Sequence, residues 1–258
     1  MGYSKFVQYG NFAEYTYYEK DVRQKSISIK KRKKKFIKIR TIRPDNLRRR
    51  VRDFRRLVIS NLSPTNPPAL LTLTSAQTVS LCSADEWLKI FLARLREFEG
   101  KDFRYISVPE FQKRGAVHFH VLVWDLRKEM INNEQQFRYL QRLWQRGFVD
   151  CLPTNGDVRL AYYLAKYMSK SMQDERLYNQ KAYRASRNVL RPVLVSSSAP
   201  FDYSEEIWGE HLNKKILLDE KKFDNYWLGK AHWRKWELDC LSPSVVDLPN
   251  NKISNQGL

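Results

Sequence analysis

Two histidines that share one face of a predicted strand are the residues best suited to chemistry. His118 and His120 lie in the alternating segment 117–123 (VHFHVLV). Side chains two residues apart on a strand point to the same side, so both imidazoles face one way and the apolar residues face the other. Such a pair can bind a divalent metal ion. The alternative is that the histidines only hydrogen-bond on a polar sheet face.

A carboxylate is expected to join the two imidazoles. Glu110 precedes the tight basic turn 113–115 (KRG). If the hairpin turns about Arg114, Glu110 lies opposite His118 on the same face of the sheet. Two imidazoles and a carboxylate then converge, with positions left open for phosphate oxygens and water. This mixture of nitrogen and oxygen ligands suits Mg²⁺ or Mn²⁺ better than a closed structural zinc site.

A predicted helix at 159–172 carries three tyrosines, of which Tyr163 and Tyr167 form the candidate pair. They lie four residues apart, beside Lys170 and with Lys166 at the margin of the band. A phenol with a pKa of roughly 10 is a poor nucleophile, so nearby ammonium groups and a metal-polarised phosphate would help it attack. The alternative is that both rings only pack. An apolar stripe of the same helix should face the core: Leu160, Leu164, Met168 and Met172.

Positive charge is concentrated near the N-terminus. The 258-residue chain has 47 Lys and Arg against 28 Asp and Glu, a net charge of +19. The segment 23–56 alone contributes +15. Such a segment favours a polyanionic partner such as a nucleic acid, whose phosphates it would bind in a salt-sensitive way. A solvated tail or a localisation signal would show the same charge. The densest run is Lys30, Lys31, Arg32, Lys33, Lys34 and Lys35.

Composition limits the class of protein. Hydrophobic residues make up 42% of the chain and aromatic residues 13%, which excludes wholesale disorder. No apolar run approaches the roughly 20 residues of a membrane span, and the N-terminus lacks the apolar core of a signal peptide. Cys82, Cys151 and Cys240 are odd in number and far apart. We therefore expect an intracellular, soluble protein with no membrane partner and no disulfide framework.

Periodicity predicts an α+β fold in which helices cover an antiparallel sheet. Apolar spacing indicates a helix over 47–58, and a capping box at 83–86 opens a second helix that stops at Gly100. After residue 175 the signal weakens, although 193–200 resembles a strand. The remaining predicted elements are strands at 69–74, 103–110, 116–124 and 148–152 and helices at 134–145 and 159–172.

Taken together, the motifs resemble those of the HUH endonucleases. A His-hydrophobic-His strand is followed about 40 residues later by Tyr-x-x-x-Tyr on a helix. This order is similar to the two-tyrosine rolling-circle replication initiators of small single-stranded DNA phages and related plasmids. The resemblance covers roughly 45–192. It also includes the family's first motif at 71–74 (LTLT), its metal motif at 108–120, the segment 144–149 and the tyrosine motif at 162–170.

The resemblance implies a metal-dependent endonuclease and strand transferase that acts on single-stranded DNA. His118 and His120 would be metal ligands with Glu110 as the third, and the cofactor would be Mg²⁺ or Mn²⁺. Tyr163 or Tyr167 would attack phosphorus, forming a 5′-phosphotyrosine link and a free 3′-hydroxyl. The other tyrosine would cut the regenerated origin after one round, and the product strand would be rejoined. Lys166 and Lys170 would assist catalysis, and Lys113 and Arg114 would contact DNA.

The same resemblance implies a catalytic domain at 45–192 with a five-stranded antiparallel sheet. The family's motifs do not include the segment 1–44, which we expect from its charge to be a basic, partly flexible DNA-binding arm. Residues 193–258 would form a C-terminal extension of unassigned role. The substrate would be an origin, with a hairpin, in the host cytoplasm or nucleoid. A host polymerase would extend the 3′-hydroxyl. A host helicase would unwind the duplex, because the sequence has no P-loop motif.

Two other functions fit some of these features. A relaxase or a single-strand transposase would use the same chemistry. Relaxases usually have a cluster of three histidines and such transposases usually a single tyrosine, and neither pattern is evident here. A non-catalytic nucleic-acid-binding protein would depend on the basic arm alone. In that case, substitutions of the histidines and tyrosines would leave its activity intact.

Overall fold

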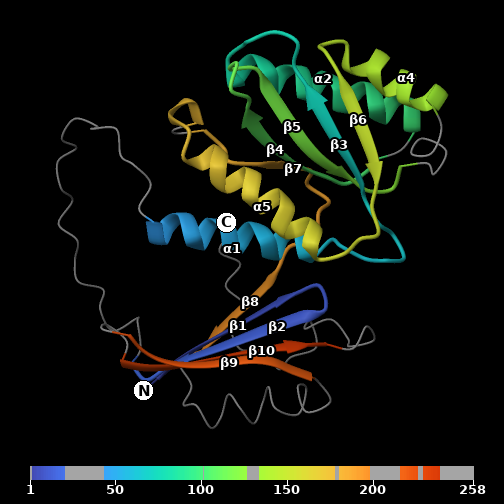
Figure 1. The fold of residues 1–258 in the computed structure, drawn as a ribbon. Coiled ribbons are helices and arrows are strands. Elements are labelled where there is room, and N and C mark those ends of the chain that lie inside the picture. Colours follow the sequence, from blue (N-terminus) through green and yellow to red (C-terminus); the bar gives the residue numbers. More distant parts are fainter. Residues whose placement is uncertain are drawn as a thin grey trace. The chain divides into compact units, whose positions relative to one another are not determined.

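The computed structural model describes residues 2–20, 44–100, 102–126, 134–177, 180–197, 216–225 and 229–238. These residues form an α+β structure with two antiparallel five-stranded sheets and four α-helices (Figure 1). The predicted fold class is therefore confirmed. The chain divides into two compact units, one of Ile39–Leu190 and one of Met1–Lys38 with Arg191–Leu258. None of the described helices is both long and apolar enough to cross a membrane.

The sheet of the first unit has the strand order β6-β3-β5-β4-β7, and every neighbouring pair is antiparallel. Its five strands confirm the predicted sheet. Only β7 was not predicted, because two residues are too few to show an alternation of apolar and polar side chains. The strands are β3 (Ala69–Thr74), β4 (Tyr105–Phe111), β5 (Val117–Val123), β6 (Val149–Pro153) and β7 (Arg184–Ala185).

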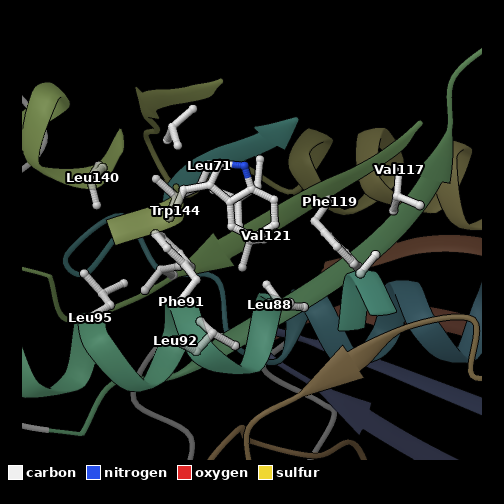
Figure 2. Close-up of a cluster of buried hydrophobic side chains, with 14 of the residues drawn as sticks. Leu71, Leu88, Phe91, Leu92, Leu95, Val117, Phe119, Val121, Leu140 and Trp144 are labelled. Carbon is white, nitrogen blue, oxygen red and sulfur yellow. The ribbon is translucent and has the colours of Figure 1, made fainter. Parts of the chain in front are cut away.

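One face of this sheet is covered by α2 (Leu81–Glu99) and α4 (Glu134–Trp144). Figure 2 shows leucines and Phe91 of α2 packed under side chains of the strands. Trp144 meets Phe91 and Phe119 edge to face, with ring centroids 5.9 and 6.4 Å apart. Burying each such side chain contributes about 1.5–3 kcal/mol. This apolar layer fixes which face of each strand remains for chemistry.

The start of α2 corrects one prediction. The helix begins at Leu81, and its N-cap is Ser80, whose hydroxyl accepts a hydrogen bond from the Ser83 backbone N–H at 3.1 Å. The capping box expected at 83–86 therefore placed the helix start too late. The predicted end is confirmed, because Gly100 adopts the left-handed φ of 66° and donates its N–H to the Arg96 carbonyl.

The opposite face of the sheet carries α5 (Arg159–Met172), which packs against β4 and against α1 (Pro44–Ile59). Helix α1 buries Phe54, Leu57 and Val58, part of the apolar stripe expected from the sequence. The hydroxyl of Ser171 on α5 donates to the backbone carbonyl of Pro109 on β4. The bond ties α5 to the strand that carries Glu110.

The second unit is a sheet built from both parts of the chain that flank the first unit. Its strand order is β8-β1-β2-β10-β9, and Phe6, Ala13, Tyr15 and Leu238 form its small core. Of these strands the sequence indicated only β8, whose expected last residues, 198–200, lie outside the described part of the chain. The strands are β1 (Tyr3–Tyr9), β2 (Phe12–Tyr18), β8 (Val193–Ser197), β9 (Ile216–Asn225) and β10 (Gly229–Glu237).

This sheet joins residues that the sequence analysis assigned to two separate segments, 1–44 and 193–258. Strands β1 and β2 form a regular hairpin within the expected arm, in which Phe6 pairs with Tyr15. The basic run 30–35 lies outside the described residues. The DNA-binding role of the arm therefore stays a prediction.

A loop glycine holds the C-terminal end of β3. Gly147 has a φ of 147°, and a Cβ at this position would collide with the Thr74 carbonyl oxygen and lie 2.7 Å from the Ala76 nitrogen. Two backbone hydrogen bonds of 2.7 Å, from Thr74 to Phe148 and from Ala76 to Arg146, fix this close approach. Since the obstructing atoms belong to the backbone, they cannot move aside cheaply.

We predict that Gly147→Ala lowers the free energy of unfolding by about 3 kcal/mol or more, because it combines backbone strain with a backbone clash. Gly100→Ala is the matched control. Its φ of 66° is also positive, but nothing lies within 4 Å of the added Cβ, so the strain of the left-handed conformation alone should cost about 1–2 kcal/mol. Urea titration monitored by tryptophan fluorescence measures both values. Equal losses would contradict the close approach at Gly147.

Candidate active site

The hairpin of β4 and β5 places a carboxylate beside the two histidines. Glu110 pairs with His118 across the strands, as the position of the turn predicted. Gly115 permits this turn through a φ of 89°. His120 Nε2 lies 3.0 Å from Glu110 Oε2, and the two imidazole centroids are 6.5 Å apart. All three side chains therefore lie on the face of the sheet opposite the apolar core.

Two ring nitrogens at this site have no hydrogen-bond partner. They are Nε2 of His118 and Nδ1 of His120, and both are buried. A buried nitrogen without a partner is costly, and a divalent ion could use its lone pair. Among the described residues, no three His, Cys, Asp or Glu side chains already stand as a ligand set. The donor types fit Mg²⁺ or Mn²⁺, whereas Glu110 is engaged in protein contacts.

Burial keeps both imidazoles neutral. It lowers the pKa of His120 below the usual 6.5, although Glu110 acts in the opposite direction. Burial also lowers the pKa of His118, and the charges of His120 and Arg114 add to this effect. Near pH 7 the rings are thus in the form that can donate a lone pair to a metal ion.

Glu110 is held in its ionised form by two hydrogen bonds. Burial alone would raise the pKa of this carboxyl group, but hydrogen bonds from Lys170 and His120 outweigh it and lower the pKa. The ammonium group of Lys170 on α5 donates to Oε1, while the His120 ring contacts Oε2. This bridge connects the tyrosine helix with the histidine strand.

The two candidate tyrosines of α5 both contact the imidazole of His120. The Tyr167 ring stacks on His120, with centroids 3.9 Å apart and planes at 25°. The Tyr163 ring meets His120 edge to face at 6.1 Å. The Tyr167 hydroxyl donates to the Tyr163 hydroxyl over 3.3 Å. The histidine and tyrosine motifs, separated by about 40 residues in the sequence, thus share one site.

The phenol of Tyr163 remains in its protonated form at neutral pH. Burial, the hydrogen bond with Tyr167 and the negative charges of Glu110 and Asp150 raise its pKa to about 12. Its side chain is nevertheless 39% exposed, so a substrate can reach it. A phenol of this kind attacks phosphorus only if the reaction removes its proton and the phosphate is polarised.

Asp150 was not expected at the site. It lies on β6, opposite Thr72 of β3, which in turn lies opposite His120 of β5. Directly opposed residues share a face, so Asp150 belongs to the same polar row as His120. The sequence offers only the short segment VDCLP as a signal, and the pairing of β6 with β3 cannot be derived from it.

The basic residues predicted to assist catalysis or to contact DNA differ in how closely the structure places them to the site. Lys166 is exposed, and its side chain forms no hydrogen bond or ion pair with another described residue, so its assistance to catalysis stays a prediction. Arg114 donates to the Ser75 carbonyl and to Gln112 Oε1, both over 2.8 Å, and lies near enough to affect the pKa of His118. Lys113 is exposed at the turn. The predicted DNA contacts at 30–35 lie outside the described part of the chain.

Comparison with known families identifies a match over residues 68–172. The matching model is described as replication-associated protein ORF2/G2P. The match spans β3 to α5 and includes both histidines and both tyrosines. It is consistent with a rolling-circle replication initiator, so the expected resemblance is confirmed, and it indicates a role in DNA replication with DNA as the partner. No curated protein and no solved structure matched the chain.

We predict that the C2–H resonances of His118 and His120 titrate below pH 6.5 in metal-free protein, since burial disfavours both imidazolium ions. Proton NMR between pH 4 and 8 measures this, with His118→Gln and His120→Gln for assignment. The unfolded chain binds these protons near pH 6.5 and the folded chain only at lower pH. As the pH decreases from about 6.5, the contribution of the two histidines to the free energy of unfolding therefore decreases as well. Midpoints at or above 6.5 would contradict the buried site.

Proposed function

We propose that the protein initiates rolling-circle replication by nicking single-stranded DNA at an origin. Tyr163 or Tyr167 attacks the scissile phosphorus, the bond to the 3′-oxygen breaks, and a 5′-phosphotyrosine link forms. The observation that carries this proposal is the contact of both tyrosine rings with His120. It brings candidate nucleophiles to candidate metal ligands within a segment that matches a replication-associated family.

His118, His120 and Glu110 are the residues that would hold Mg²⁺ or Mn²⁺. A bound ion supplies Lewis-acid polarisation of the scissile phosphate and stabilises the charge that develops on it. The neutral imidazoles provide lone pairs, and the ionised carboxylate provides negative charge. For Glu110 to serve as a ligand, it must exchange at least one of its contacts with Lys170 and His120.

The proton balance of the nick follows from the state of the phenols. The attacking tyrosine loses its hydroxyl proton as the oxygen–phosphorus bond forms, and the departing 3′-oxygen gains one to become a hydroxyl. With a pKa of about 12, Tyr163 keeps its proton until attack begins. Lys170, which lies on the same helix and contacts Glu110, provides positive charge near the reacting phosphate. One phosphodiester replaces another, so no ATP is needed.

Two neighbouring phenols allow two successive transfers in one site. The hydroxyls of Tyr163 and Tyr167 are 3.3 Å apart, and both rings contact the same imidazole. After a host polymerase has extended the 3′-hydroxyl and a host helicase has displaced the strand, the unused tyrosine cuts the regenerated origin. The released 3′-hydroxyl then attacks the first phosphotyrosine and closes a circle. We place this reaction in the host cytoplasm or nucleoid.

We predict that protein incubated with Mn²⁺ and a pool of random-core single-stranded oligonucleotides forms a covalent adduct that survives SDS. Tyr163→Phe and Tyr167→Phe should each leave some adduct, whereas the double variant should lose it, because no phenol then remains over His120. EDTA should prevent formation of the adduct. Denaturing gels with labelled DNA measure the yield.

Tyr139→Phe is the matched control for this experiment. The Tyr139 ring lies against Phe98 at a centroid distance of 3.9 Å, with the planes tilted by 33°, and α4, which carries it, covers the other face of the sheet. Its adduct yield should equal that of the parent. An adduct that persists in the double variant, or no adduct with any origin-containing strand, would contradict the proposal.

A further inference from the structure

An exposed tyrosine next to the candidate nucleophiles carries an arginine on its ring. Tyr162 precedes Tyr163 on α5, and its side chain is 52% exposed. The guanidinium carbon of Arg55 on α1 lies 4.9 Å from the centroid of the Tyr162 ring. The part of the ring that Arg55 does not cover is therefore available to a ligand.

The guanidinium group of Arg55 has N–H donors that could bind a ligand. No carboxylate among the described residues forms an ion pair with it, and its guanidinium group lies over the ring of Tyr162. A guanidinium group presents five N–H donors along its edges, and stacking on a ring leaves these edges free. Such an arginine suits a phosphate, which accepts two parallel hydrogen bonds.

Helix α1 extends this positive surface. Arg48, Arg52 and Arg55 recur at intervals of four and three residues and therefore share one side of the helix. The ion pairs of Arg48 with Asp45 and of Arg52 with Asp53 are long, at 3.7 and 3.3 Å, and exposed. Exposed pairs of this kind contribute little, so phosphates can compete for these arginines.

We propose that Tyr162 and Arg55 form a binding subsite for the single-stranded DNA that Tyr163 or Tyr167 cuts. One base stacks on the exposed part of the Tyr162 ring, while Arg55 and the arginine stripe of α1 bind neighbouring phosphates. Tyr162 adjoins Tyr163 in the chain, so the stacked base belongs to a nucleotide near the scissile phosphate. Stacking on an aromatic ring with phosphate contacts alongside is how proteins hold single strands. The inference rests on the proposed function, which makes this strand the substrate.

Photo-cross-linking tests the subsite without catalysis. The full chain with Tyr163→Phe and Tyr167→Phe is irradiated in EDTA with a random-core 20-mer in which 5-iododeoxyuridine replaces thymidine, and tryptic peptides are identified by mass spectrometry. In this background the peptide 160–166 contains Tyr162 as its sole tyrosine. We expect a cross-link at Tyr162. If every cross-link maps to other peptides, the subsite is wrong.

Affinity variants provide the second readout in the same background. Tyr162→Leu should weaken binding of the 20-mer roughly ten-fold, the typical effect of losing one base stack. Arg55→Gln should reduce the cross-link yield at Tyr162 and the salt dependence of binding. Arg142→Gln is the matched control, since it removes the same charge from an exposed position of α4, and it should leave the cross-link unchanged.

The two proposals fail separately. Loss of the covalent adduct with a retained Tyr162 cross-link would contradict the nicking reaction and support the subsite. A normal adduct with unchanged cross-linking and affinity in Tyr162→Leu and Arg55→Gln would support nicking and overturn the subsite.

Discussion

The alternation of side chains along β5 is the constraint on which the candidate site depends. Phe119 and Val121 must be buried against α2 and α4, and this leaves His118 and His120 on the opposite face. A slip of one residue would bury two imidazoles in the apolar layer and expose the apolar side chains. The cost of such a slip fixes the register of the hairpin, and the register brings Glu110 opposite His118.

Charge then connects the sheet with the helix above it. A partly buried carboxylate needs partners, and Glu110 finds them in His120 of β5 and Lys170 of α5. The same contacts hold α5 at the position where Tyr163 and Tyr167 cover His120. Burial has a further consequence, because it keeps the imidazoles neutral and the Tyr163 phenol protonated. In the proposed reaction, the neutral imidazoles suit a metal ion, whereas the protonated Tyr163 phenol would need help to lose its proton.

Local patterns predicted the parts of this site, whereas their assembly required the structure. The bounds of β3 and α5 follow from apolar periodicity, and the pairing of Glu110 with His118 follows from the turn. The stacking of Tyr167 on His120 and the placement of Asp150 depend on contacts between distant segments that no local pattern reveals. The second sheet was not predicted for the same reason, since its strands come from the sequence segments before and after the first unit.

The central claim is that a divalent ion binds at the histidines directly beneath the tyrosines. The most direct test is ¹⁹F NMR of protein that contains 3-fluorotyrosine, titrated with paramagnetic Mn²⁺ and assigned through single Tyr→Phe variants. Our account predicts that the Tyr163 and Tyr167 signals broaden first, that Tyr139 on the other face of the sheet broadens least, and that His118→Gln with His120→Gln abolishes the difference. Equal broadening of all three signals, or selective broadening that survives the loss of both histidines, would contradict it.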